Sequence, residues 1–79
     1  MARIIDGTEM NIVGHRVREL RIARKMSQQT LSNKLEMLAI YICRGSISRI
    51  EDKQRTVTDI ELLGLAQVLN VPIEDLFKE

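Results

Sequence analysis

The chain is poor in the residues that build covalent or metal cross-links. Among its 79 residues it has one cysteine, Cys43, and one histidine, His15. A single thiol cannot form an internal disulfide, and the sequence has no cluster of cysteines and histidines that could hold zinc. We therefore expect no metal site and no cofactor.

Aromatic side chains and long apolar runs are also scarce. One tyrosine, one phenylalanine and no tryptophan are present, so the core must be built from leucine, isoleucine and valine. The longest apolar run, residues 37–43, is far shorter than the roughly 20 residues that a membrane helix needs. No apolar segment follows a basic start, so no secretory signal is visible. We expect a cytoplasmic protein with no membrane partner.

What the chain does contain is enough apolar surface for one small domain. Its length fills a single core, and 44% hydrophobic residues indicate a globular chain. Residues 1–55 carry 11 Lys/Arg and 6 Asp/Glu, whereas residues 56–79 carry 1 and 5. The net charge of +1 therefore hides a basic face on the first part and a neutral or acidic face on the last.

Apolar residues recur with a helical period after the first ten residues. One repeat predicts a helix from the N-cap Asn11 to about Lys25, and another predicts a helix that follows the N-cap Ser27. Residues 1–10 show no period and are expected to form a flexible or loosely docked arm, which leaves 11–79 as the domain. The two repeats comprise Val13, Val17 and Leu20, then Leu31, Leu35 and Leu38.

The segment between the second and third helices has no glycine or proline before Gly45. We therefore expect the second helix to run longer than usual, with the turn at residues 39–42. The apolar side chains of residues 36–43 are expected in the core, and an exposed patch for dimer contact is the alternative. Cys43 is then the N-cap of a third helix over residues 44–52.

Two further helices complete the prediction. Thr58 and Glu61 form a capping box for a fourth helix, which Asn70 and Pro72 end. A short fifth helix over residues 73–77 closes the core with Leu76 and Phe77. No segment alternates with period two for long enough to be a strand, so we expect an all-α domain of five helices. The fourth helix is expected to bury Ile60, Leu63, Ala66 and Leu69, flanked by Leu62, Leu65 and Val68.

The order of these elements resembles a known family. The first helix contains VGHRVRELR, the second begins with SQxxL, and the third contains ISRIE, before a polar turn and a capped helix. This pattern resembles the lambda-repressor-like, Cro-type helix-turn-helix family, also called the xenobiotic-response-element family, over about residues 12–77. The resemblance implies a sequence-specific transcriptional regulator that binds a palindromic DNA operator as a homodimer. Repression is favoured over activation.

The resemblance also implies roles for individual residues. The third helix would lie in the major groove as the recognition helix, and Gln28 would sit on the DNA backbone. Arg21 and Glu51 would form a largely buried ion pair that orients the recognition helix. The residues facing bases would be Arg44, Gly45, Ser46 and Arg49, with Ser48 beside them, and the phosphate contacts would be Lys53, Gln54 and Arg55.

The chemistry of these residues suits such roles, although plainer interpretations stay open. Arg44 can donate two hydrogen bonds to O6 and N7 of a guanine. Gly45 lowers helix propensity by up to about 1 kcal/mol relative to alanine, but lets the backbone approach a base edge. Arg44 and Arg49 could instead form an ordinary solvated face, and Gly45 could be the remnant of a turn. For Cys43 we expect a small buried hydrophobe rather than a redox switch.

Three classes of function can be compared on the sequence. The DNA-binding regulator is favoured, and repressors of mobile elements, antitoxins and restriction-system controllers are equally consistent with it. A helical module that binds a protein partner, with weak or lost DNA binding, is the alternative. An enzyme is rejected because no nucleophile–base pair, carboxylate pair or phosphate-binding glycine loop is present. The expected dimer surface is acidic and apolar and comprises Leu62, Leu65, Val71, Ile73 and Phe77.

Overall fold

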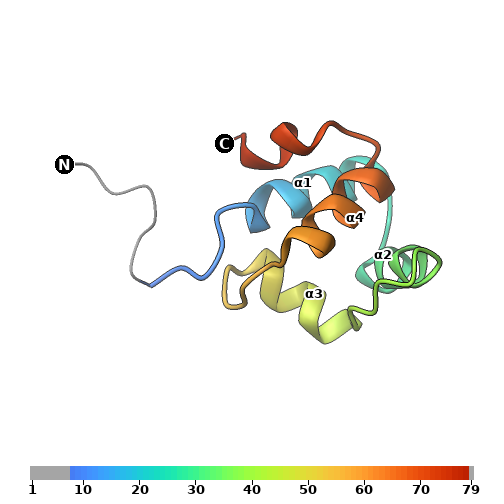
Figure 1. Cartoon of the computed structure of the whole chain (residues 1–79), viewed down its shortest axis with the longest axis horizontal. Helices are drawn as coiled ribbons and strands as arrows, with labels where there is room; N and C mark the ends of the chain where they lie inside the picture. The colour runs from blue at the N-terminus through green and yellow to red at the C-terminus, as the bar shows by residue number, and fades with distance from the viewer. Residues whose placement is uncertain (1–7, 79) are drawn as a thin grey trace.

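The computed structural model of the chain describes residues 8–78 and is built from helices (Figure 1). This architecture confirms the all-α prediction, and the described residues contain no β-strand. The fifth predicted helix has the expected bounds but is a 3₁₀ helix, so residues 8–78 form four α-helices and one 3₁₀ helix. The elements are α1 (Gly14–Ala23), α2 (Gln28–Glu36), α3 (Arg44–Glu51), α4 (Asp59–Leu69) and η1 (Ile73–Phe77).

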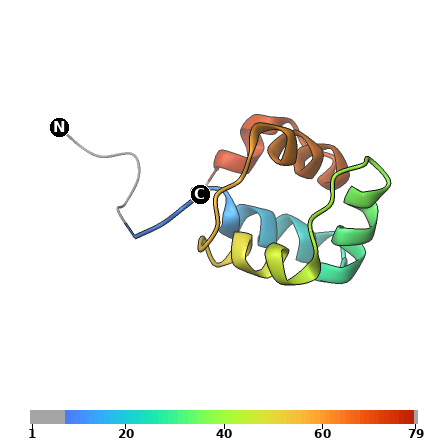
Figure 2. The same cartoon turned by 60° about the horizontal axis from the view of Figure 1, so that its bottom comes forward.

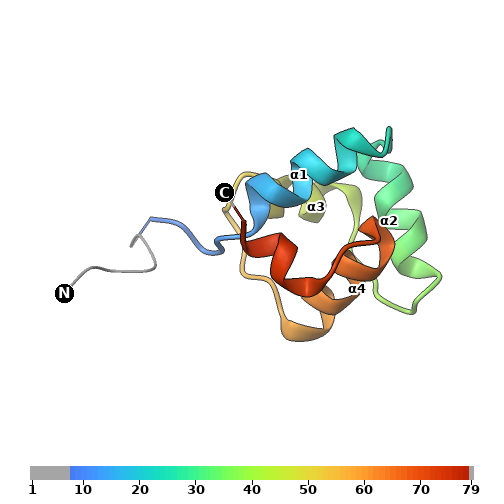
Figure 3. The same cartoon turned by 90° about the horizontal axis from the view of Figure 1, so that it is seen from above.

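The helices enclose one hydrophobic core. Figure 2 shows α1 and α3 next to each other, with α2 across one end of the pair and α4 on the other side of the core. The 3₁₀ helix η1 packs on α1 and α4, and it lies on the opposite side of the molecule from α3 (Figures 1 and 3). The buried apolar side chains are Val13, Val17, Leu20, Leu31, Leu35, Ile42, Ile47, Ile50, Leu65, Ala66, Leu69 and Leu76.

Two helices begin with the side-chain caps that the sequence predicts. The hydroxyl of Ser27 accepts a hydrogen bond from the backbone N–H of Thr30 at 3.0 Å. The capping box of α4 is complete, because Glu61 N–H donates to Thr58 Oγ1 at 3.1 Å and Thr58 N–H donates to Glu61 Oε1 at 3.0 Å. These contacts satisfy backbone donors that have no partner within the helix.

Each α-helix is followed by a residue in the left-handed conformation, and none of these residues is glycine. After α2 this residue is Ala39, with φ of 59°. The N–H of Ile40 then donates to the carbonyl of Leu35 at 3.0 Å, as in a Schellman motif. The helix therefore ends at Glu36, and the prediction of a longer helix with its turn at residues 39–42 is wrong. The four left-handed residues are Lys25, Ala39, Lys53 and Asn70.

The buried face of α4 agrees with the prediction only in part. Leu65, Ala66 and Leu69 are buried as expected. Ile60 and Leu63 were expected in the core but are 66% and 61% exposed. The buried face includes Gly64, where a Cβ atom would overlap the Cδ1 atom of Ile40. Because Gly64 has no side chain, the segment that precedes α3 lies directly on α4, and this contact fixes the rotation of the helix. Other apolar residues expected in the core are also exposed or partly exposed, namely Met37, Leu38, Tyr41 and Phe77.

No helix in the described part of the chain is long and apolar enough to cross a membrane. Nor do residues 8–78 bring together a group of three or more His, Cys, Asp or Glu side chains that could hold a metal ion.

The substitution Ala39→Gly is expected to raise the free energy of unfolding by about 0.5–1 kcal/mol, because glycine adopts the left-handed conformation without a Cβ penalty. Urea denaturation followed by circular dichroism measures the change. The control is Ala23→Gly in the last helical position of α1, which should lower the free energy of unfolding by a similar amount. An Ala39→Gly protein no more stable than its parent would contradict the structure of this turn.

Candidate nucleic-acid interface

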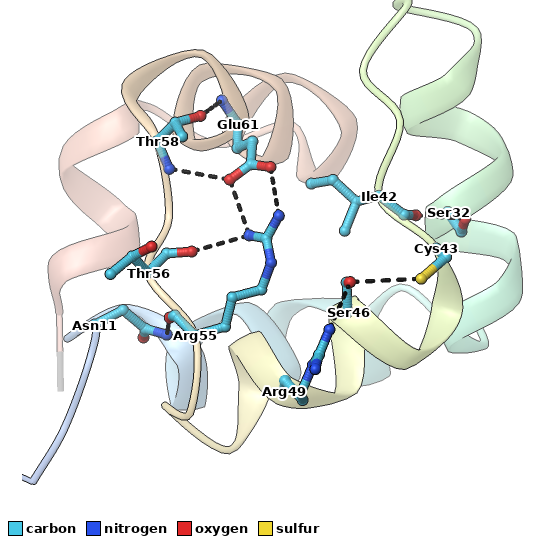
Figure 4. A network of polar contacts seen from close by, with 10 residues as sticks. All are labelled: Asn11, Ser32, Ile42, Cys43, Ser46, Arg49, Arg55, Thr56, Thr58 and Glu61. Carbon is cyan, nitrogen blue, oxygen red and sulfur yellow. Dashed lines mark hydrogen bonds and ion pairs between the residues drawn. The ribbon is translucent and has the colours of Figure 1, made fainter.

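The helix α3 begins at Arg44, directly after Cys43, as the sequence predicts. Cys43 is exposed, so the expectation of a buried small hydrophobe is wrong. The buried side chain at this point belongs to Ile42, and the cap position turns outward. The thiol of Cys43 lies 3.4 Å from the hydroxyl of Ser46 (Figure 4), and its hydrogen bonds with Ser46 lower the pKa of Cys43 below its ordinary value.

The inner side of α3 is anchored by packing and by one hydrogen bond before the helix. Ile47 and Ile50 are fully buried, at the spacing that places them on one helix face. The hydroxyl of Ser32 on α2 donates to the carbonyl of Ile42 at 2.6 Å, which ties the approach of α3 to α2 (Figure 4). No role for Ser32 could be predicted, because its partner is a backbone carbonyl that any residue could supply.

The outer side of α3 carries the residues predicted to face DNA bases. Arg44, Gly45 and Arg49 are exposed, whereas Ser46 and Ser48 are half-buried. Arg49 Nη2 lies 3.3 Å from the Ser46 hydroxyl. Nothing lies within 4 Å of the place where a Cβ atom of Gly45 would be. Glycine at this position lowers the helix propensity of α3 relative to alanine, and packing within the chain gives no reason for it.

A buried carboxylate joins the far end of α3 to α1 and α2. Glu51 is only 3% exposed and accepts hydrogen bonds from Arg21 Nε at 2.7 Å and Arg21 Nη2 at 3.1 Å. The amide of Gln28 donates to the same carboxylate at 3.1 Å. Arg21 Nη1 also donates to the carbonyl of Met26 at 2.8 Å, in the turn between α1 and α2. The pair that the family resemblance implies is thus a three-residue network, because Gln28 belongs to it.

The loop between α3 and α4 carries the three residues predicted to hold phosphates. Gln54 is exposed, and Lys53 Nζ lies 3.6 Å from the carboxylate of Glu9. Arg55 is turned toward α4, where its guanidinium forms a two-point ion pair with Glu61 at 2.9 and 2.8 Å (Figure 4). This pairing lowers the pKa of Glu61 and raises that of Arg55. Both cations of the loop are therefore paired, but Arg55 has the shorter, two-point pair, whereas Lys53 makes a single, longer contact with Glu9.

The segment before α1 is attached to this loop. Most of the arm expected over residues 1–10 lies outside the described residues, but the N–H of Met10 donates to the carbonyl of Lys53 at 3.0 Å. Asn11 is not the N-cap of α1, which begins at Gly14. Its side-chain oxygen nevertheless accepts hydrogen bonds from the N–H groups of Val13 and Gly14, at 3.2 and 2.8 Å.

The other end of the Asn11 amide makes long-range contacts. Its nitrogen donates to the carbonyls of Ile50 at 3.1 Å and Arg55 at 2.8 Å. All four hydrogen bonds of the amide are therefore used, and Asn11 links the start of α1 to the end of α3. Sequence reasoning assigned it only a capping role. Its distant partners are backbone carbonyls, so no residue type in the sequence indicates them.

The structure thus places the predicted residues in three groups. Arg44, Gly45 and Arg49 share the exposed side of α3. Gln28 lies at the far end of α3 through its bond to Glu51, and Lys53 and Gln54 lie in the loop just after the C-cap Asp52. Arg55 stands apart because it faces α4. We expect the first two groups to form one surface along the exposed side and the end of α3.

Replacing Glu51 with glutamine is expected to lower the free energy of unfolding by about 3–5 kcal/mol, because it leaves the buried charge of Arg21 without a counterion. Thermal or urea denaturation measures the loss. The matched control is Glu19→Gln, because Glu19 is exposed and its nearest guanidinium atom, in Arg16, is 4.0 Å away. That change should cost less than about 0.5 kcal/mol. Losses of equal size would show that the Glu51 network does not hold the helices.

Comparison with known proteins agrees with this geometry. A family model described as "Helix-turn-helix" matches residues 17–76. The crystal structure of the restriction-modification controller protein C.AhdI from Aeromonas hydrophila is 34% identical in sequence, with a TM-score of 0.73. That match covers 82% of this chain and 87% of C.AhdI. No curated protein matches the chain.

The DNA-binding domain of BldD has the same fold. It is 20% identical, with a TM-score of 0.73, and the match covers 94% of this chain and 100% of that domain. At this identity the likeness shows the fold alone. The family model spans most of the chain, and its match agrees with the motifs in the sequence. The chain belongs to the lambda-repressor-like, Cro-type helix-turn-helix family of DNA-binding domains.

Proposed function

We propose that the protein is a transcriptional regulator that binds a palindromic DNA operator as a homodimer, with α3 in the major groove. The observation that carries this proposal is the two-sided character of α3. Ile47, Ile50 and Glu51 anchor its inner side. Its outer side offers Arg44 and Arg49, both exposed, with the bare backbone of Gly45 between them. An arginine at this place can donate two hydrogen bonds to guanine O6 and N7.

Contacts with the DNA backbone are proposed on both sides of the end of α3. The N-terminus of α2 offers backbone N–H groups and the positive end of a helix dipole, which favour a phosphate. Gln28 lies there, and Gln29 beside it is exposed. Lys53 and Gln54 flank the same end of α3 on the other side. Such contacts fix the register of the protein on the duplex, whereas base contacts supply specificity.

The dimer surface is proposed on the outer side of α4. Leu65, which the sequence assigned to this surface, is buried and is not available for it. Ile60 and Leu63 are exposed and share one helix face at i and i+3 spacing. One domain contacts only a half-site of a few base pairs, so a two-fold dimer doubles the contacts and matches a palindromic operator.

The similarity to C.AhdI favours one of the three biological settings that the sequence allowed. C.AhdI is a restriction-modification controller protein, and 34% identity over most of both chains makes it the more similar of the two structures compared. We propose the control of a restriction-modification system as the setting of this protein. Repressors of mobile elements and antitoxins stay as alternatives, and so does a protein-binding module without DNA binding.

Selection of bound duplexes from a random pool should yield a palindromic consensus. Arg44→Ala and Arg49→Ala should each weaken binding of that duplex by about 5- to 150-fold, which corresponds to about 1–3 kcal/mol for a lost base contact. The control is Arg18→Ala, because Arg18 is also an exposed arginine but lies on α1. Undetectable binding of any duplex, at low as well as at high salt, would favour the protein-binding module.

Replacing Leu63 with glutamate should separate the dimer into monomers and weaken operator binding, because it places a charge in an apolar contact. Analytical ultracentrifugation measures the mass. Ile22→Glu is the matched control, since Ile22 is also about half exposed but lies on α1. If the Leu63→Glu protein stays dimeric, or if both variants dissociate, the proposed surface is wrong.

A further inference from the structure

Arg55 was predicted to hold a phosphate, but its guanidinium has partners within the chain. Nη1 donates to Glu61 Oε1 and to the carbonyl of Thr56, both at 2.9 Å. Nη2 donates to Glu61 Oε2 at 2.8 Å. Three of the five N–H donors of the side chain are therefore used, two by the carboxylate of Glu61 on α4 and one by the carbonyl of Thr56 in the loop before it (Figure 4). The side chains of Arg55 and Glu61 are only 27% and 13% exposed, so the pair is partly shielded from water.

The carboxylate that faces Arg55 is itself fixed. Glu61 Oε1 accepts the N–H of Thr58, and the backbone N–H of Glu61 donates to the Thr58 hydroxyl. Glu61 therefore belongs to the first turn of α4 and cannot follow Arg55 toward solvent. If Arg55 turned to a phosphate, it would leave a partly buried carboxylate without its cation. A two-point arginine–carboxylate pair is among the stronger contacts in proteins.

The main chain of Arg55 is held toward α3, whereas its side chain faces α4. The Asn11 amide nitrogen bridges its carbonyl and the carbonyl of Ile50 in the last turn of α3. The backbone at residue 55 is thus tied to α3, while its side chain is tied to α4. Lys53 and Gln54 lie between these two attachment points, Ile50 and Arg55. The geometry of the loop is therefore set by residues that lie on both sides of it.

We propose that Arg55 is a positioning residue that acts through Glu61, and not a phosphate contact. It holds the α3–α4 loop against α4 so that Lys53 and Gln54 meet the phosphates beside the groove that α3 occupies. This inference rests on the proposed function, because it assigns a role within DNA binding. It differs from the assignment that the family resemblance implies for Arg55.

A double-mutant cycle in operator affinity tests the inference. The variants are Arg55→Gln, Glu61→Gln and the double variant, and the probe is a fluorescent duplex with the consensus recovered from the random pool. Glutamine at position 61 can still complete the capping box, so this change removes the ion pair and spares the helix start. Each single variant should weaken binding about tenfold, and the double variant also about tenfold rather than a hundredfold.

Two further variants and a measurement of the folded fraction distinguish a positioning role of Arg55 from a direct effect of its charge on DNA and from a loss of folded protein. Arg55→Lys keeps the positive charge but not the two-point pair, so it should weaken binding nearly as much as Arg55→Gln. Arg44→Gln lies at the other end of α3, and its effect should add to that of Glu61→Gln. Circular dichroism at the assay temperature gives the folded fraction, and the affinities are compared per folded molecule. A loss that came only from unfolding would disappear after this correction.

A direct contact of Arg55 with a phosphate predicts different affinities for the same variants. If Arg55 contacts a phosphate, Glu61→Gln frees it and leaves binding unchanged or stronger, and Arg55→Lys keeps most of the affinity. Either result overturns the positioning role while the loss in Arg44→Gln still supports DNA binding. If neither the parent protein nor any variant binds a duplex, the proposed function itself fails, and the role of Arg55 fails with it.

Discussion

The buried carboxylate of Glu51 is the contact on which the placement of α3 depends. It accepts two hydrogen bonds from Arg21 on α1 and one from Gln28 on α2, so one side chain connects three helices. A buried pair of this kind adds little net stability, but its loss strands a charge in the interior. Other angles between α1, α2 and α3 would break the pair, so the carboxylate selects one arrangement of the helices.

That arrangement explains how a small domain can present a helix with a rigid position. The start of α3 is tied to α2 through Ser32 and the carbonyl of Ile42. Its end is tied to α1 through Arg21 and through the amide of Asn11. The buried isoleucines of α3 fill the core between these ties. The outer side of the helix does not pack against the rest of the domain, and Arg44, Gly45 and Arg49 on this side are therefore available for contact with DNA.

The sequence predicts the helices well and their ends less well. Local signals, such as the cap at Ser27 and the capping box of α4, depend on neighbouring residues and are confirmed. The end of α2 could not be predicted, because the residue in the left-handed conformation after it is Ala39, whereas this position is usually occupied by glycine. The exposure of Ile60 and Leu63 on α4 could not be predicted either, because the rotation of this helix depends on the contact of Gly64 with Ile40, which precedes α3.

The same difference between local and distant signals applies to the site. The exposed residues of α3 follow from helix periodicity, so sequence reasoning finds them. The partners of Arg55 and Asn11 require the tertiary structure, because a carboxylate in a capping box and a backbone carbonyl are ordinary features of a sequence. Family resemblance supplied the pair of Arg21 and Glu51 but not the third member, Gln28.

We propose that Arg44 contacts a guanine in the major groove. This contact can be tested by measuring the affinity for a consensus duplex in which single guanines are replaced by 7-deazaguanine, which lacks the N7 acceptor. At one position in each half-site the replacement should weaken binding of the parent protein by about tenfold and leave that of the Arg44→Ala variant unchanged. Equal losses in the two proteins at every position, or no loss at any position, would contradict the claim.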